Sequence, residues 1–459
     1  MTAGTPLDPD ALDPDRLLPA DPRTREVARE LHALVESAPI ISPHGHVDPR
    51  LLVEDRPYTD PASLLVTSDH YVTRMLHAAG ASLEHVGAGA DPREAWRLFC
   101  ENWHTLHGTA SGVWLRATLA NVLGIVGPPL PEHYDQLVAL LAEPRMRPRA
   151  LFDAFGIEVL ATTDDPLDDL AAHAALRDDP GFRGRVIPTF RPDAYLDPAA
   201  PGWQERVDRL GGTGYDGYLE ALRARRAHFI AHGAVSADHG VEHATTLELS
   251  RREAASLFDH ARSGALAPGE AERFRAHMLF ESARMSVDDG LVMTVHAGVA
   301  RNHHTATFER FGPDTGHDIP ITTSFTRELR PLLERFGTAQ GLHLVLFALD
   351  ETTWSRELAP LAGFYPSVYI GAPWWFLDAP DAIARFRAAT TETAGFYRGS
   401  GFIDDTRAFL SIPARHDVAR RVDAGYLARL VVEGRLTLDE ASRIAHDLVD
   451  AIPRRAFKL

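Results

Sequence analysis

The residues best suited to chemistry stand at the ends of short apolar runs, which predict buried strands. His44 and His46 flank one glycine after such a run, and alternation along a strand aims both imidazoles to one side, where they can bind one metal ion. Another run ends in Asp404 and Asp405; we interpret Asp405 as the carboxylate of a His/His/Asp metal site and Asp404 as a helix cap. His296 closes a third run and is a further candidate. The alternatives are surface-loop histidines for the pair and a core histidine for His296.

Three arginines also follow predicted strand ends: Arg191, Arg301 and Arg407. A planar guanidinium group binds a carboxylate through two parallel hydrogen bonds, so three of them predict an anionic substrate. A structural ion pair is the alternative for each arginine taken alone. Trp374 and Trp375 follow another run, where one indole could stack on the apolar face of a sugar ring while the other packs in the core.

Composition excludes several kinds of chemistry. The chain has 459 residues with one cysteine, Cys100, so an intrachain disulfide and a multi-thiolate zinc site are excluded. The sole lysine is Lys458, which argues against Schiff-base catalysis and against a carbamylated lysine bridging two metal ions. We therefore predict a mononuclear metal site with histidine and carboxylate ligands.

Charge and hydropathy indicate where the protein acts. The net charge of -17 makes nucleic acid an unfavourable partner, although a local basic cleft could bind a small anion. No apolar run approaches the length that spans a bilayer, and the N-terminus is acidic and rich in proline rather than basic and then apolar. We predict a cytoplasmic protein without a membrane partner.

The apolar runs alternate with stretches of helical periodicity, which favours an α/β fold. Seven runs are visible, at 38–47, 156–166, 184–193, 290–302, 341–351, 367–376 and 401–409. We predict a distorted (β/α)₈ TIM-like barrel over 1–459 as one domain, with a doubly wound sheet as the alternative. The stretches 50–150 and 200–285 are expected to be helical insertions without a clear strand, and the eighth strand is expected within 50–150. Polar residues at strand ends then lie where barrels place active sites.

At these residues the sequence resembles the uronate isomerases, a branch of the amidohydrolase superfamily with a distorted (β/α)₈ barrel. The resemblance runs nearly end to end and rests on HGHVDP, SDHY, TTDDP, PTFRPD, HAGVARNHHTATFERFGPDTGHD, PWWF and DDTRAFLS. The stretch 103–120 departs from the family, because it lacks the histidine-rich pattern usual there. The implied cofactor is one divalent metal ion, zinc or, as the second choice, manganese, and the resemblance also implies a homo-oligomer.

The resemblance implies a role for each site residue. It implies that the metal is bound by His44, His46 and Asp405; that the uronate is held by Arg191, Arg301, Arg407 and Trp374; and that the catalytic groups are Asp405, His70, Tyr71 and His296. Only the resemblance selects His70 and Tyr71, because the sequence pattern around them is that of a helix start.

The implied reaction is aldose–ketose isomerisation of a small-molecule hexuronate, D-glucuronate to D-fructuronate or D-galacturonate to D-tagaturonate, by proton transfer through an enediol. Asp405, Tyr71 and a water on the metal stay open as the base, and a hydride shift is a different route to the same product. The alternative function is a mononuclear metal-dependent hydrolase, such as a lactonase or a deaminase. A third class is a sugar-acid binding protein without catalysis.

Overall fold

The central strands pair in parallel around a closed circuit. The computed structural model describes residues 12–459. The strands of the circuit are β1 (Ile40–Ser42), β2 (Ile157–Ala161), β3 (Arg185–Ile187), β4 (Thr189–Phe190), β5 (Ser236–Val241), β6 (Val292–Ala297), β9 (Leu344–Ala348) and β10 (Val368–Ile370). One sheet has the order β1-β2-β3 and the other β10-β9-β6-β5-β4. Strands β6 and β9 are buried along their whole length, which is typical of parallel strands covered by helices.

The two sheets join at a proline. Strands β3 and β4 are consecutive and separated only by Pro188, which has no amide hydrogen to give to a ladder. Just beyond β2, Asp164 forms an isolated parallel bridge with Phe190 of β4. The interruption is therefore local, and β3 and β4 form one broken strand of the circuit.

The segment 399–406 closes the circuit on its other side. Its first residue, Gly399, forms a parallel bridge with Ile370 at the end of β10. At its far end the carbonyl oxygen of Thr406 accepts a hydrogen bond of 3.0 Å from the amide of His46, just after β1. Counting β3 and β4 as one, eight segments follow one another in chain order around the circuit, which is the distorted (β/α)₈ barrel predicted from the sequence.

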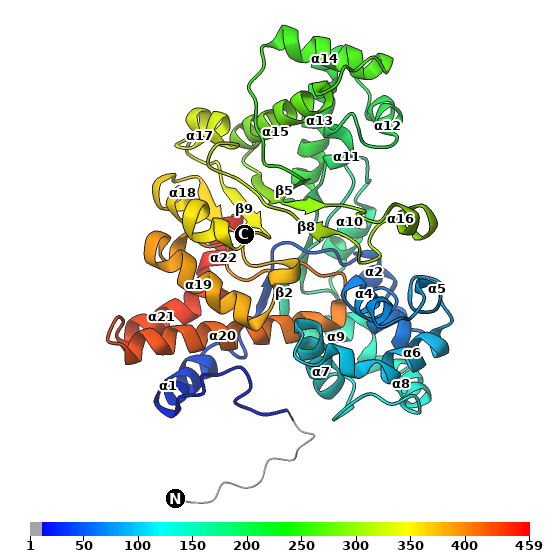
Figure 1. Ribbon diagram of the computed structural model, residues 1–459, viewed down its shortest axis with the longest axis vertical. Coiled ribbons are helices and arrows are strands. Elements are labelled where there is room, and N and C mark those ends of the chain that lie inside the picture. Colours follow the sequence, from blue (N-terminus) through cyan, green and yellow to red (C-terminus); the bar gives the residue numbers. More distant parts are fainter. Residues whose placement is uncertain (1–11) are drawn as a thin grey trace, which may run out of the picture.

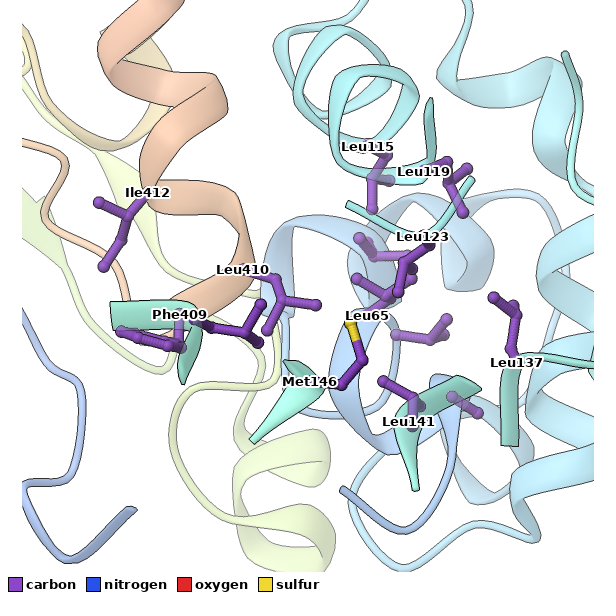
Figure 2. Packing of buried hydrophobic residues seen from close by; sticks show 14 of the residues in the cluster. Leu65, Leu115, Leu119, Leu123, Leu137, Leu141, Met146, Phe409, Leu410 and Ile412 are labelled. Carbon is purple, nitrogen blue, oxygen red and sulfur yellow. The ribbon is translucent and has the colours of Figure 1, made fainter. Parts of the chain in front are cut away.

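A helical region separates β1 from β2. Its helices are α2 (Arg50–Glu54), α3 (Pro61–Leu65), α4 (His70–Ala78), α5 (Leu83–Val86), α6 (Pro92–Glu101), η1 (Trp103–Leu106), α7 (Ala110–Asn121), α8 (His133–Leu141), η2 (Pro144–Met146) and α9 (Pro148–Ala154). Its leucines and Met146 pack against Phe409, Leu410 and Ile412, which directly follow the closing segment (Figure 2). This packing fixes the chain on which Asp405 and Arg407 lie.

A second helix-rich region lies between β4 and β6. It contains α11 (Asp193–Leu196), α12 (Trp203–Leu210), α13 (Gly214–Ala231), β5, α14 (Arg251–Ser263) and α15 (Glu270–Asp289). The expectation that 200–285 lacks a strand is wrong, because β5 lies inside it, and the eighth strand is not within 50–150. Strand β5 escaped the prediction because its residues include Asp238, His239 and Gly240 where a buried parallel strand usually has apolar residues. The division into one domain with two insertions stays a prediction.

The other elements cover the barrel and its rim (Figure 1). They are α1 (Pro22–Ala33), α10 (Ala171–Asp178), β7 (Val299–Ala300), α16 (Thr305–Phe311), β8 (Ile319–Pro320), α17 (Arg330–Phe336), the π-helix η3 (Trp354–Leu358), α18 (Ala359–Phe364), η4 (Trp375–Leu377), α19 (Pro380–Ala394), η5 (Phe396–Arg398), η6 (Phe409–Ser411), α20 (Ile412–Val432), α21 (Leu438–Val449) and α22 (Ala451–Phe457). Strands β7 and β8 pair antiparallel as a small hairpin that carries α16. Within 12–459, no helix is long and apolar enough to cross a membrane.

Candidate active site

The predicted metal-binding side chains meet where β1 and the closing segment end. The Nε2 atoms of His44 and His46 lie 3.4 and 3.0 Å from Oδ1 of Asp405. One possible ligand atom from each of the three residues lies within 4.8 Å of the others. A Cβ at Gly45 would make only ordinary van der Waals contact, at 3.4 Å from the carbonyl oxygen of Ala161.

This group fits a divalent cation. Oδ1 of Asp405 is buried and accepts no well-aligned hydrogen bond from the described chain, although two imidazole nitrogens face it. A buried acceptor in this setting is costly unless a cation shares it. Burial opposes ionisation of Asp405, but the two histidines outweigh it and hold its pKa well below the usual value. The donor set is therefore one ionised carboxylate and two imidazoles, which suits zinc and similar ions.

The two histidines differ in their electrostatic surroundings. Burial opposes protonation of His44, but the charges of Asp238 and Asp405 outweigh burial and raise its pKa. Burial wins at His46 and lowers its pKa, even though Asp405 acts in the opposite direction. The extra negative charge beside His44 comes from a residue that the sequence analysis did not select.

That residue, Asp238, lies on β5 and is completely buried. Its Oδ1 lies 2.6 Å from Nδ1 of His296 and accepts a hydrogen bond of 2.6 Å from the hydroxyl of Thr294. Burial opposes its ionisation, but the charges of His296, His44 and Arg191 outweigh burial and hold the pKa of Asp238 well below the usual value. Since an ionised carboxylate only accepts, the proton of a neutral His296 is on Nδ1. Nε2 of His296 is then an acceptor, and it has no partner within 12–459.

Aromatic rings fix the orientation of His296. Its ring stacks on Phe347 at 4.1 Å between centroids and on His44 at 4.8 Å, and it meets Trp374 edge-on at 4.7 Å. His44, Asp238 and His296 also form a second group with metal-ligand spacing, which shares His44 with the first. The structure thus places His296 beside the predicted metal ligands.

Arg191 lies between two carboxylates. Its Nε donates to Oδ2 of Asp193 at 2.9 Å, and its Nη1 lies 3.3 Å from Oδ2 of Asp238. Burial disfavours its charge, but Asp238 and Asp193 outweigh burial and raise its pKa. The guanidinium is a fixed positive charge beside the two histidine groups.

Arg301 and Arg407 come from different elements and approach one loop. Nη1 of Arg301 donates to Asp318 at 3.0 Å, and its guanidinium carbon lies 4.7 Å from the ring centroid of Trp375. Asp314 accepts from both terminal nitrogens of Arg407, at 3.2 and 3.3 Å, and its other oxygen lies 4.0 Å from Nη1 of Arg301. Burial opposes ionisation of Asp314, but Arg407 outweighs burial and lowers its pKa. A carboxylate of the chain therefore stands between the two predicted substrate-binding arginines.

His70 and Tyr71 are the first two residues of α4. Asp69 caps this helix by accepting a hydrogen bond of 2.8 Å from the amide of Tyr71, so both rings are held at the helix start. The rings stack at 4.6 Å between centroids, and His70 meets Trp375 at 5.7 Å. Burial lowers the pKa of His70 and raises that of Tyr71 well above 10. Tyr71 therefore carries its proton at neutral pH.

One cavity of about 590 Å³ gathers most of the predicted residues. Its lining includes His46, His70, Tyr71, Arg191, Arg301, Trp374, Asp405 and Arg407, together with Asp193, Asp314, Asp318 and Trp375. His44 lies behind this wall, and His296 lines an adjoining cavity of about 390 Å³ that also borders Arg301. All the residues selected from the sequence are thus brought to one place at the carboxyl ends of the strands.

The comparisons with known proteins agree with this arrangement. The glucuronate isomerase family model matches residues 23–456. A uronate isomerase from Corynebacterium efficiens is 52% identical, with 98% of this chain and 99% of that protein covered, and one from Rhizorhabdus wittichii is 54% identical, with 98% of each covered. The crystal structure of glucuronate isomerase from Caulobacter crescentus superposes with a TM-score of 0.95 at 47% identity, covering 98% of this chain and 97% of that one.

This chain belongs to the glucuronate isomerase family. The resemblance stated from the sequence is confirmed, and so is the enzyme class, an isomerase of the intramolecular oxidoreductase type. The comparisons support the isomerase and not the hydrolase alternative.

Sequence reasoning missed the carboxylates that hold the site of this isomerase together. Asp238 and Asp193 fix Arg191, and Asp314 and Asp318 fix the other two arginines. The available signal for Asp238 was an Asp-His pair within the short segment 236–241. That segment had not been recognised as a strand.

One detail of the prediction is wrong. Asp404 does not cap a helix; its side chain is buried, and its Oδ2 lies 3.1 Å from Nε2 of His416. Asp404 turns toward α20, whereas Asp405, whose backbone lies in the left-handed region at φ 42°, faces the histidines.

Proposed function

We propose that this enzyme interconverts an aldose hexuronate and its ketose, D-glucuronate with D-fructuronate or D-galacturonate with D-tagaturonate, by proton transfer through an enediol. The observation that carries the proposal is the His44, His46 and Asp405 group in the wall of a cavity that also presents three arginines. Family membership supplies the reaction class, and the cavity supplies groups for the two ends of such a substrate.

The arginines hold the substrate carboxylate. Arg301 and Arg407 approach one another through Asp314, which marks the place where a carboxylate bridges them. Arg191 lies nearer the histidines, beside Asp238, and binds hydroxyl oxygens of the sugar chain. Trp374 packs on the edge of His296 and presents an apolar surface to the carbon chain. With the carboxylate fixed, the aldehyde end reaches the metal-binding group.

One divalent cation, zinc or, as the second choice, manganese, is held by His44, His46 and Asp405. Such an ion, when bound, polarises the carbonyl oxygen and lowers the barrier to removal of the neighbouring proton. Nε2 of His296, with its proton fixed on Nδ1 by Asp238, accepts a hydrogen bond from a substrate hydroxyl.

The proton transfers then fall to two residues of this chain. Asp405 is ionised, so its carboxylate takes the proton from C2 and returns it to C1. Tyr71 is protonated at neutral pH, so its hydroxyl donates to O1 as the enediol forms. In the second half of the reaction the resulting phenolate takes the proton of the hydroxyl on C2. Every proton is accounted for, and each group ends in its starting state.

Charge and composition support the remaining parts of the proposal. With a net charge of -17 the protein is not expected to bind nucleic acid. We place it in the cytoplasm, as a homo-oligomer whose only small-molecule partner besides the metal is the hexuronate.

The test is proton NMR of the purified enzyme in heavy water with D-glucuronate and, separately, D-galacturonate, each with and without added zinc or manganese. Formation of the ketose with deuterium at the exchanging carbon supports both the reaction and the enediol. Ketose without solvent deuterium would refute the proton-transfer route, and no conversion of either sugar under any condition would refute the proposed reaction.

The matched variants are Asp405→Asn and Tyr71→Phe. Both remove a proposed proton-transfer group with little change of shape, so each should lower kcat by roughly 10²–10⁴-fold. Only Asp405→Asn should also lower the metal content, which is measured by mass spectrometry after dialysis against dilute chelator.

A further inference from the structure

Behind Tyr71 lies a buried ion pair that the reaction as described does not use. Arg415 of α20 donates from Nη1 to Oδ2 of Asp378 at 2.7 Å, and both side chains are almost inaccessible, at 1% and 2% exposed. Its Nε donates to the hydroxyl of Ser411 at 3.1 Å. Its guanidinium carbon lies 3.5 Å from the ring centroid of Trp114 and 5.5 Å from that of Tyr71. Asp378, Ser411 and Trp114 therefore hold the cation in place. It faces the ring of Tyr71.

A structural role alone accounts poorly for this pair. Burying two charges costs desolvation energy that their attraction often does not recover, so such a pair is weak evidence of a stabilising design. The pairing is also incomplete, since Nη2 of Arg415 and Oδ1 of Asp378 have no hydrogen-bond partner in the described part of the chain. Burial raises the pKa of Asp378 to about 7 despite the neighbouring Arg415. This energetically costly ion pair lies next to Tyr71, which lines the cavity.

The position of Trp114 strengthens the argument. Trp114 belongs to α7 and is buried. Its ring lies edge-on to Tyr71, with centroids 5.8 Å apart, and face-on to the Arg415 cation. A single side chain of α7 therefore contacts both the cation and the tyrosine ring.

Arg415 and Arg74 are the cations among the charged groups that act on Tyr71. The others are Asp405 of the closing segment, Asp378 at the end of η4 and Asp69 at the start of α4, and the neighbouring ring is that of His70. Burial raises the pKa of Tyr71, Arg415 is the strongest opposing influence, and the three carboxylates add to the effect of burial. Of these two cations, Arg415 has the larger effect on negative charge at the phenol oxygen.

We propose that Arg415 is a positioning residue for Tyr71: its clamped guanidinium fixes the tyrosine ring at the cavity wall and stabilises negative charge on the hydroxyl oxygen while the proton is on the substrate. The inference rests on the proposed function, because it takes Tyr71 as the group that lends and recovers a proton. Arg415 itself is not among the residues that line the cavity.

The decisive variants differ in whether the cation stays beside Tyr71: one removes only its counter-ion, and the other removes the cation as well without changing the net charge. Asp378→Asn leaves the cation without its counter-ion, and Arg415→Met combined with Asp378→Asn removes both charges without stranding either. The protein is made with 3-fluorotyrosine at its 10 tyrosines, and the ¹⁹F resonance of Tyr71 is assigned by its loss in Tyr71→Phe. Titration of this resonance reads the ionisation of Tyr71 without any need for activity.

We expect Tyr71 to ionise at lower pH in Asp378→Asn and at higher pH in the double variant, by about one pH unit each way. In the double variant kcat should fall about tenfold with little change in KM, because a one-unit shift corresponds to a tenfold change in the stability of the phenolate. Where the double variant does not fold, Asp378→Asn alone decides by the direction of its shift. A folded variant with an unchanged Tyr71 titration would overturn the inference.

The matched control is Arg420→Met. Arg420 is also a buried arginine of α20, but it donates to the carbonyl oxygens of Glu36, Ala38 and Pro39, away from the cavity. Its loss should reduce stability and leave the Tyr71 resonance in place; an equal shift in this control would also overturn the inference. If the wild type fails to convert hexuronates, the proposed function fails, while the ¹⁹F titration still reports on the link between Arg415 and Tyr71.

Discussion

Replacement of Asp238 by asparagine should disable the enzyme while leaving the fold intact. The carboxylate of Asp238 faces Nδ1 of His296 at 2.6 Å and Nη1 of Arg191 at 3.3 Å. Asparagine has nearly the same shape but no charge, and its amide can donate to Nδ1 of His296. The proton of the imidazole would then move to Nε2, so the group that faces the substrate changes from an acceptor to a donor.

The expected loss follows from these two contacts. A hydrogen bond to a charged group contributes about 1.5–3 kcal/mol, and taking a similar value for the buried ion pair with Arg191, losing both contacts weakens the arrangement by roughly 3–6 kcal/mol. At about 1.4 kcal/mol for each tenfold change, kcat/KM of Asp238→Asn should fall by roughly 10²–10⁴-fold. The loss should appear mainly in kcat, because Arg191 keeps its second partner, Asp193, at 2.9 Å.

The assay is ketouronate formation followed by NMR, with circular dichroism melting to confirm the fold. The control is Asp193→Asn, which weakens the hold on Arg191 without touching His296 and should therefore raise KM more than it lowers kcat. A folded Asp238→Asn enzyme whose kcat lies within about threefold of wild type would refute the reasoning. The same pattern of kcat and KM in both variants would show that Asp238 acts through Arg191 alone.

Three further outcomes follow from other contacts. Asp314→Asn frees Arg407 from the carboxylate of the chain, so a sugar acid without an aldehyde should bind about tenfold more tightly by calorimetry; weaker binding would mean that Asp314 positions the arginine. Gly371→Ala places a Cβ 2.4 Å from Phe347, which stacks on His296, so kcat should fall with the metal content unchanged. Burial opposes ionisation of Asp417, but a histidine and two arginines outweigh burial and lower its pKa to about 2. Its stabilising contribution is therefore present above pH 4 and lost as pH falls toward 2, so Asp417→Asn should cost about 2 kcal/mol in urea unfolding at pH 7 and almost nothing at pH 2.

The barrel could be predicted because most of its strands are buried on both sides. The segments that become β6 and β9 are apolar along their length, and no surface helix has that pattern over so few residues. The break between β3 and β4 could not be predicted. Pro188 interrupts the hydrogen-bonded ladder there, but the chain continues in the same direction on both sides. The closing segment was predicted as a strand at 401–409, but its neighbours in the barrel were not predictable, because it keeps one isolated bridge, from Gly399 to Ile370, and one hydrogen bond to His46.

The site was predictable where a residue stands at the end of a recognisable strand. His44, His46, His296 and Asp405 satisfy this condition, and the structure brings all four together. The partners of the arginines do not satisfy it: Asp314, for example, lies in the loop between α16 and β8, and only the folded hairpin carries it to Arg407.

Strand β5 shows why the most informative residue was the hardest to find. Its signal as a strand is weak because Asp238 faces the barrel interior, where an apolar residue would have made the strand recognisable. The ionised carboxylate is tolerated there only because His296, Thr294 and Arg191 surround it. A polar residue inside a barrel strand must be compensated by several others, and two of these, His296 and Arg191, line the adjoining cavities of the site. The failure of the strand prediction and the location of the site therefore have the same physical cause.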